Sequence, residues 1–148
     1  MIHSFRKKNG TYRWNELPLL AYKEEGTHFK SITRQTLFGE EQGLCSQWRY
    51  FEIAPGGHST LERHRHVHGV MILRGRGKAL VGKRVLRVKT LDLLYVPTLT
   101  WHQFRPTGKE PLGFLCLVNC ERDRPERPDP KSLAQIRRQR DAAKFIRV

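Results

Sequence analysis

The feature that most restricts the fold of this chain is the regular alternation of short apolar runs with glycine and proline turns. Turn signals at Pro55-Gly56-Gly57, Gly75-Arg76-Gly77, Gly82-Lys83 and Pro97 separate the runs, and no helical period survives such interruptions. The predicted strands are Gln47–Ala54, Val70–Leu73, Lys78–Val81, Arg84–Val88 and Leu93–Val96, with further strands at Lys30–Phe38 and Leu112–Asn119. The sequence therefore predicts an all-β, antiparallel barrel or sandwich.

The length of the chain, 148 residues, is that of a single domain with short appendages. We expect three parts: an N-terminal extension over residues 1–29, a barrel domain over residues 30–120, and an extended segment followed by a terminal helix over residues 121–148.

The C-terminal part carries clear helix signals. Asp129 and Pro130 form an N-cap and first-turn pair, which predicts a short helix over residues 132–145. Its narrow apolar stripe, made by Leu133, Ile136 and Ala143, is expected to pack against the barrel or a partner subunit.

Composition restricts the location and the partners of the protein. The chain starts with no apolar run, so we expect a cytoplasmic protein without a signal peptide or membrane contact. The formal charge of +14 invites a nucleic-acid interpretation. However, the basic residues between positions 74 and 89 alternate with apolar ones, as on the wet face of an antiparallel sheet. We therefore favour a solvated or anion-attracting face over a nucleic-acid groove.

The three cysteines, Cys45, Cys116 and Cys120, are too few and too irregularly spaced for a disulfide framework. They also form no Cys-x-x-Cys pair of the kind found in zinc knuckles. We expect them to be buried thiols.

The histidines are concentrated in the predicted barrel. His58, His64, His66 and His68 lie within eleven residues that also contain Glu62, and His102 follows Pro97. On a continuous strand Glu62, His64, His66 and His68 would project to the same face. If that face is the interior, the cost of burying unpaired imidazoles and a carboxylate predicts a bound ion. Neutral imidazoles with a carboxylate suit divalent Fe, Mn, Ni, Cu or Zn.

The spacing of these residues follows a known pattern. Pro55-Gly56-Gly57 precedes Glu62-x-His64-x3-His68-x6-Gly75, and Asp92-x4-Pro97-x4-His102 comes later. Over about residues 54–106 this arrangement resembles the two motifs of the cupin superfamily. The resemblance implies a double-stranded β-helix, the cupin or jelly-roll barrel, with one metal ion at its mouth. The second motif departs from the usual pattern, because Leu91 and Leu99 stand at glycine positions and Pro106 stands at the asparagine.

The resemblance also implies the metal ligands: Glu62, His64, His68 and His102. Glu62 stands where the first histidine of the usual motif stands, which leaves the identity of the metal open. A competing set of His64, His66, His68 and His102 keeps a literal His-x-His but breaks the spacing from Gly56. In the preferred register His66 lies in a loop outside the first shell of ligands, and His58 is a surface residue beside the glycine turn.

The same parity argument predicts the pocket around the metal. Val70, Ile72, Phe104 and Met71 are candidates for apolar walls, and His66 is a further candidate pocket residue. Arg49 and Arg34 could bind a substrate carboxylate if they point inward, although outward solvation is the simpler expectation for each.

Three functions remain open at this stage. The first is a metal-dependent enzyme acting on a small molecule, most simply an oxygenase, with isomerase or lyase chemistry as variants. The second is a non-catalytic ligand-binding or sensor cupin, and the third is a basic RNA-binding accessory protein. Cupins commonly pair through N-terminal strands, and the strand Lys30–Phe38 with the aromatic residues Tyr12 and Trp14 leads us to expect a homodimer.

Overall fold

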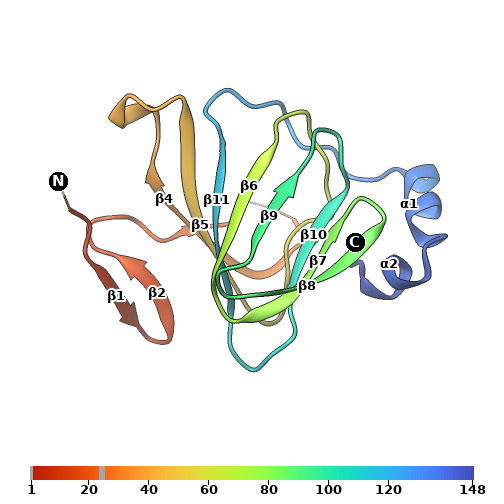
Figure 1. The fold of residues 1–148 in the computed structure, drawn as a ribbon, viewed down its shortest axis with the longest axis horizontal. Helices are drawn as coiled ribbons and strands as arrows, with labels where there is room; N and C mark the ends of the chain where they lie inside the picture. Colours follow the sequence, from red (N-terminus) through yellow and green to blue (C-terminus); the bar gives the residue numbers. More distant parts are fainter. Residues whose placement is uncertain (1, 24–25) are drawn as a thin grey trace.

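Two antiparallel sheets and a small hairpin make up the molecule in a computed structural model, which describes residues 2–23 and 26–148 (Figure 1). The larger sheet has the order β3-β4-β5-β11-β6-β9, and the smaller one has the order β10-β7-β8. The large-sheet strands are β3 (Leu20–Ala21), β4 (Lys30–Phe38), β5 (Ser46–His58), β6 (His68–Arg74), β9 (Leu93–Val96) and β11 (Leu112–Asn119). The small sheet contains β7 (Arg76–Val81), β8 (Arg84–Lys89) and β10 (His102–Pro106). The all-β cupin barrel predicted from the sequence is confirmed.

The core lies between the two sheets, because each strand turns its apolar residues toward the opposite sheet. The large sheet contributes Phe51, Ile53, Ile72 and Phe114, and the small sheet contributes Phe104 among others. Phe114 stacks between Phe51 and Phe104, with ring centroids 5.4 and 4.7 Å away. The three stacked rings also line the cavity that contains the histidines.

The strand boundaries at β4, β9 and β11 agree with the sequence prediction, whereas β5 is longer than expected. Pro55-Gly56-Gly57 is not a turn but part of β5, which continues to His58. Gly56 has φ of +79°, and the register with β4 shifts there, so that Lys30 pairs with His58 and Ile32 pairs with Ile53. The glycine thus forms a bulge that bends the strand without ending it.

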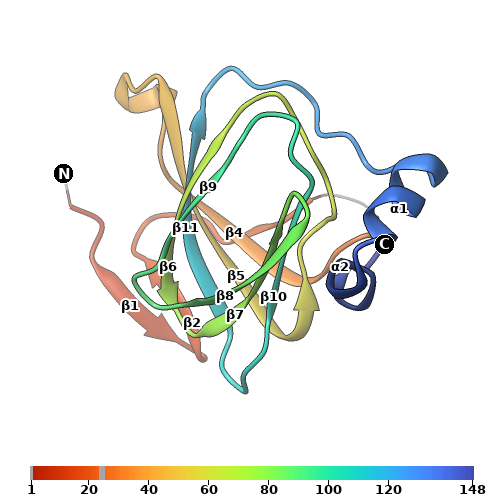
Figure 2. The ribbon, with the colours of Figure 1, turned by 45° about the vertical axis from the view of Figure 1, so that its right-hand side comes forward.

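The C-terminus also differs from the single predicted helix. It forms α1 (Pro130–Arg137) and α2 (Arg140–Phe145), and Gln139 between them is extended. Asp129 caps α1 as predicted, accepting a hydrogen bond of 2.7 Å from the Ser132 backbone amide. The break lets Ile136, Ala142 and Phe145 all pack on the outer side of the small sheet around Leu80. Both helices lie beside that sheet (Figure 2). Ala143, predicted on the apolar stripe, is exposed because a continuous helix is not formed.

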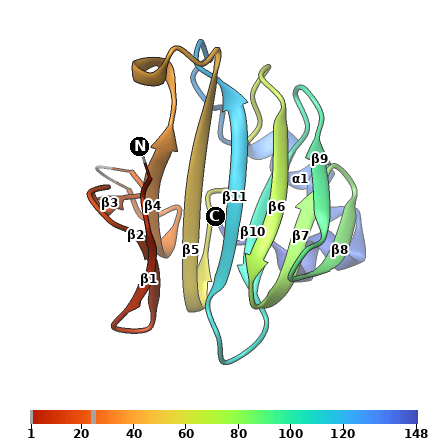
Figure 3. The same cartoon turned by 60° about the vertical axis from the view of Figure 1, so that its left-hand side comes forward.

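Residues ahead of the barrel, which the sequence left unassigned, form a hairpin of β1 (Phe5–Lys8) and β2 (Thr11–Trp14). This hairpin lies beside the large sheet at the β4 and β5 side (Figure 3). Tyr12 stacks on Tyr50 and Trp14 meets the same ring edge-on, at centroid distances of 6.3 and 5.0 Å. Tyr12 and Trp14 are therefore packed within their own chain.

A buried ion pair joins the hairpin to the barrel. Glu52 and Arg74 are 6% and 5% exposed and meet at 3.0 Å. Glu52 also accepts hydrogen bonds from the Tyr50 hydroxyl at 2.8 Å and from the Tyr12 amide at 3.1 Å. Arg74 donates to the Gly10 carbonyl and pairs with Glu110.

No described helix is long and apolar enough to cross a bilayer.

We predict that Glu52→Ala lowers the free energy of unfolding by about 3–5 kcal/mol, because it removes the buried counter-charge of Arg74 and leaves only the exposed carboxylate of Glu110. Urea unfolding followed by tryptophan fluorescence measures the change. Lys89→Met, which removes an exposed ion pair with Asp92, is the control and should barely move the transition midpoint. Equal effects of the two substitutions would contradict a structural role for the buried pair.

Candidate metal centre and its pocket

Three histidines converge at the open end of the barrel. His68 begins β6, His102 begins β10, and His64 lies in the loop that joins β5 to β6. One ring nitrogen of each lies within 4.8 Å of the others. All three side chains are buried, at 2–8% exposure. The structure thus brings together three of the four residues proposed as ligands.

The loop that carries Glu62 and His64 is not the continuous strand assumed in the parity argument. Residues 59–67 form no regular strand. Glu62 and His102 instead form an isolated antiparallel bridge, in which each backbone amide donates to the other carbonyl at 3.2 and 3.0 Å. The carbonyl of His64 accepts a bond from the Leu99 amide at 2.7 Å. Backbone pairing therefore holds the loop against the start of β10.

The hydrogen bonds of the three imidazoles leave metal-binding nitrogens free. Nδ1 of His64 and Nδ1 of His102 bond to the carbonyls of His66 and Thr100 at 2.7 and 2.9 Å. Since a carbonyl can only accept, both Nδ1 atoms carry the proton and both Nε2 atoms present lone pairs. Nε2 of His64 and of His68 are buried without a hydrogen-bond partner among the described residues. Orphaned, buried imidazole lone pairs of this kind fit a borderline divalent ion.

Burial also keeps the imidazoles of His68 and His102 in the form that binds metal. It lowers the pKa of His68 strongly, and it lowers the pKa of His102 to about 4. Neighbouring histidines add to the shift, because a second positive charge nearby is unfavourable. Both rings are therefore neutral at pH 7.

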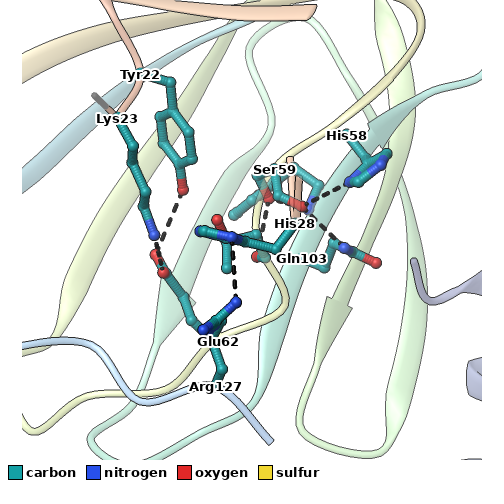
Figure 4. A network of polar contacts seen from close by, with 10 residues as sticks. Tyr22, Lys23, His28, His58, Ser59, Glu62, Gln103 and Arg127 are labelled. Carbon is teal, nitrogen blue, oxygen red and sulfur yellow. Dashed lines mark hydrogen bonds and ion pairs between the residues drawn. The ribbon is translucent and has the colours of Figure 1, made fainter. Parts of the chain in front are cut away.

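Glu62 lies in the same pocket, but its carboxylate is outside the group of three converging nitrogens. It accepts a hydrogen bond of 2.6 Å from Lys23 Nζ and a longer one of 3.4 Å from the Tyr22 hydroxyl (Figure 4). The N-terminal segment thus supplies a cation that neutralises this buried carboxylate. Its place among the metal ligands stays a proposal.

The remaining histidines have other partners. His66 stacks flat on His64 with ring centroids 3.6 Å apart, and its Nδ1 bonds to Asp123 at 2.7 Å. It lies outside the convergent group, in the loop expected for the preferred register. His58, at the end of β5, is half-buried and bonds to the Ser59 carbonyl (Figure 4).

A cavity of about 240 Å³ surrounds the histidines. Of the proposed pocket residues, Arg49, Phe104 and His66 line this cavity, and Arg34 lines it as well. Val70 and Ile72 belong to the core below it. Met71 pairs with Leu115 and Leu93 on the opposite face of the sheet, because its parity differs from that of its neighbours.

Several lining residues come from parts of the chain where sequence reasoning found no site. Tyr22 and Lys23 precede the barrel, and Arg122 and Asp123 follow it. Cys116 on β11 also lines the cavity, with Sγ 3.3 Å from Nδ1 of His68. The prediction that all three cysteines are buried holds for Cys116 but is wrong for Cys45, which is exposed, and for Cys120, which is partly exposed, because both lie beyond the paired ends of β5 and β11.

Comparison with known proteins agrees with this geometry. The sequence pattern of the cupin domain family matches residues 49–118, which contain all three converging histidines. A protein from Rhodospirillum rubrum is 54% identical over 143 residues, covering 96% of this chain and 91% of its own. The chain belongs to the cupin superfamily. That relative of the cupin is named 1-methylthio-D-xylulose 5-phosphate methylsulfurylase.

Solved structures resemble this cupin over nearly its whole length. A cupin-2 domain from Rhodospirillum rubrum is 54% identical and superposes with a TM-score of 0.87, covering 95% of each chain. A cupin 2 conserved barrel protein from Rhodopseudomonas palustris is 44% identical, with a TM-score of 0.89 over 98% of this cupin and 99% of that chain. The polyketide cyclase RemF from Streptomyces resistomycificus, at 19% identity and a TM-score of 0.71 over 91% and 94% of the two chains, shares the fold.

We predict that His64→Ala and His102→Ala proteins lose bound transition metal, because each removes one of three converging nitrogens. Elemental analysis of protein purified without chelators measures the metal per chain. His58→Ala should retain the metal of the wild type.

Glu62→Ala and His66→Ala, measured in the same way, decide the fourth ligand. Loss of metal in the Glu62 variant alone supports the register counted from Gly56. Loss in the His66 variant with full metal in the Glu62 variant would overturn it.

Proposed function

We propose that this cupin is a metal-dependent enzyme that cleaves the carbon–sulfur bond of a small methylthio-substituted sugar. The observation that carries the proposal is the thiol of Cys116, which lies in the same buried cavity as the three histidines. The name of the 54% identical relative, a methylsulfurylase of a methylthio-sugar phosphate, supports this substrate class.

A divalent ion of Fe, Mn, Ni, Zn or Cu held by His64, His68 and His102, with Glu62 as a proposed fourth ligand, would act as a Lewis acid on a substrate carbonyl beside the scissile bond. Bond cleavage then needs a group that accepts the methylthio fragment. Cys116 is suited to this role because its thiol is within the cavity and close to His68.

The step balances with the thiol alone. The bond between carbon and sulfur breaks, and a disulfide forms between the methylthio sulfur and Cys116 Sγ. The carbon keeps the electron pair and receives the proton of the thiol, so carbon is reduced while the two sulfurs are oxidised. A second, low-molecular-weight thiol then attacks the disulfide and releases Cys116. The reducing cytoplasm, the location expected from the sequence, supplies such thiols.

The environment of Cys116 adjusts its reactivity. Burial raises the pKa of the thiol, and the nearby guanidinium of Arg49 opposes that shift. Arg49 and Cys116 face each other across β5 and β11, and Arg49 Nη2 lies 4.0 Å from Sγ. A positive charge at this distance favours the thiolate, which is the nucleophilic form.

We predict that Cys116→Ser protein retains its metal but loses carbon–sulfur cleavage by at least about 100-fold, because a hydroxyl cannot form the disulfide intermediate. Product formation from a methylthio-ketose phosphate with added thiol, together with elemental analysis, measures both properties. Cys45→Ser, at an exposed position, is the matched control and should be as active as the wild type.

The other functions expected from the sequence give different results in the same experiment. Oxygen uptake that depends on substrate would favour the oxygenase. Binding of the substrate without turnover would favour the sensor, and RNA retained through moderate salt in protein without metal would favour the RNA-binding protein.

We also propose that the protein is a homodimer formed through the outer face of the large sheet. The registers place Tyr95, Leu93, Met71, Leu117 and Trp48 on this face. Leu93 is 72% exposed and Tyr95 is 62% exposed, and the β1–β2 hairpin covers the sheet elsewhere, at Tyr50. An apolar stripe on an edge strand is unfavourable in water and is well suited to self-association through a two-fold axis.

We predict that the double variant Leu93→Lys, Tyr95→Lys is a monomer at micromolar concentration, because like charges would face each other across the two-fold axis. Light scattering after size exclusion measures the mass. Lys83→Glu, in the turn between β7 and β8, should leave the dimer intact. A wild-type protein that is already monomeric would refute the interface.

A further inference from the structure

Three arginines line the cavity of the histidines. Arg34 on β4 and Arg49 on β5 share the parity of Phe51 and therefore face the interior. Arg122 follows β11 and reaches the same cavity. This contradicts the simpler expectation that Arg34 and Arg49 point to solvent.

These guanidinium groups have no counter-charge among the described residues. Nε of Arg34 and Nε of Arg49 are buried and have no hydrogen-bond partner there. Arg122 bonds only to neutral oxygens, the amide of Gln47 and the carbonyl of Asn119, both at 3.0 Å. Within residues 2–23 and 26–148, no ion pair involves any of the three.

The acidic residues that line the cavity are already engaged. Lys23 Nζ forms an ion pair with the Glu62 carboxylate at 2.6 Å. Asp123 accepts bonds from His66 Nδ1 and from the backbone amides of Arg65 and His66. Within the part of the chain that the structure describes, the positive charge of Arg34, Arg49 and Arg122 is therefore uncompensated.

The pKa values of Arg34 and Arg122 also reflect the closeness of the three guanidinium groups. Burial and the charge of Arg49 lower the pKa of Arg34, and burial and Arg49 also lower the pKa of Arg122. Guanidinium groups that repel one another at a partly desolvated site lose this cost when an anion binds between them.

We propose that Arg34, Arg49 and Arg122 bind the phosphate monoester of the substrate, an inference that rests on the proposed function for the identity of the substrate. A phosphate dianion offers three oxygens and a double charge, which matches three guanidinium groups better than a carboxylate does. Cys116 Sγ lies 3.3 Å from His68 Nδ1 and 4.0 Å from Arg49 Nη2, so the thiol contacts both the histidines and the arginines. The phosphate end of the substrate thus lies on the arginine side of the thiol and its carbonyl end lies on the histidine side.

Titration of the metal-loaded, full-length protein with inorganic phosphate tests the site by calorimetry, with acetate at matched ionic strength as the comparison. Each of Arg34→Gln, Arg49→Gln and Arg122→Gln should weaken phosphate binding about 10- to 100-fold, the value of one charge-assisted hydrogen bond. Arg87→Gln, exposed on β8 outside the cavity, is the matched control and should bind as the wild type does.

Further measurements separate the arginine site from the metal. Elemental analysis should show full metal in the three variants, and His102→Ala protein should still bind phosphate. If a glutamine variant fails to fold, the corresponding lysine variant and the rise in melting temperature of the wild type with phosphate replace it. Unchanged phosphate binding in all three variants, or acetate binding as tight as phosphate, would overturn the proposal.

Kinetics separate this inference from the proposed function. With a phosphorylated methylthio-ketose, the Arg34 and Arg122 variants should lose kcat/KM, and with the unphosphorylated analogue they should match the wild type. Arg49 is not used in this comparison because it also contacts the thiol of Cys116. Phosphate binding that depends on the arginines in a protein without carbon–sulfur cleavage would refute the proposed function alone. Cleavage of the phosphorylated substrate that ignores the arginine substitutions would refute the phosphate site alone.

Discussion

The site depends on the two backbone hydrogen bonds between Glu62 and His102. Residues 59–67 have no strand of their own, so this bridge, together with the bond from the Leu99 amide to the His64 carbonyl, holds His64 beside two histidines that begin separate strands. While the backbones of Glu62 and His102 are paired in this way, the side chains of both residues line the cavity. Once the backbone is fixed, the carbonyls of His66 and Thr100 orient two of the rings, and burial keeps the ring of His102 neutral. The chemistry of the pocket is thus prepared by main-chain pairing.

Much of the fold was predictable, because alternation and turn residues are local signals. The strands β4, β9 and β11 begin and end where the sequence pattern placed them. Glycine predicted turns less reliably, because it occurs inside a strand and is absent from two positions with positive φ. Gly56 supports a bulge inside a strand, while Leu91 and Leu99, at positions where the family motif has glycine, still adopt φ of +72° and +52°. Tertiary pairing imposes these conformations on leucine, at a cost of order 1–2 kcal/mol per residue. The backbone conformation of the motif is therefore kept although leucine replaces glycine at both positions.

The histidines were predictable from spacing, whereas the rest of the cavity was not. Lys23 and Asp123 lie far from the motif in sequence, and no local period marks either one as a neighbour of His66 or Glu62. Cys116 carried a usable signal, because its parity along β11 matches that of Phe114 in the core. The same alternation along β4 and β5, counted from Phe51, predicts that the side chains of Arg34 and Arg49 face the interior. The expectation that Arg34 and Arg49 are solvated was wrong because it followed from the charge of their side chains and not from their position in the alternation of the strands.

The walls of the cavity come from both ends of the chain, with Tyr22 and Lys23 on one side and Arg122 and Asp123 on another, while the aromatic stack and the strands beneath them belong to the barrel alone. During synthesis the barrel strands leave the ribosome before the segment that completes the pocket. A nascent chain can therefore acquire its core before it can shelter an ion or a substrate. Loss of the residues behind Asn119 would open the cavity to water and would also uncover the apolar cluster around Leu80 on the outer side of the small sheet, so the same segment completes the pocket and protects the barrel.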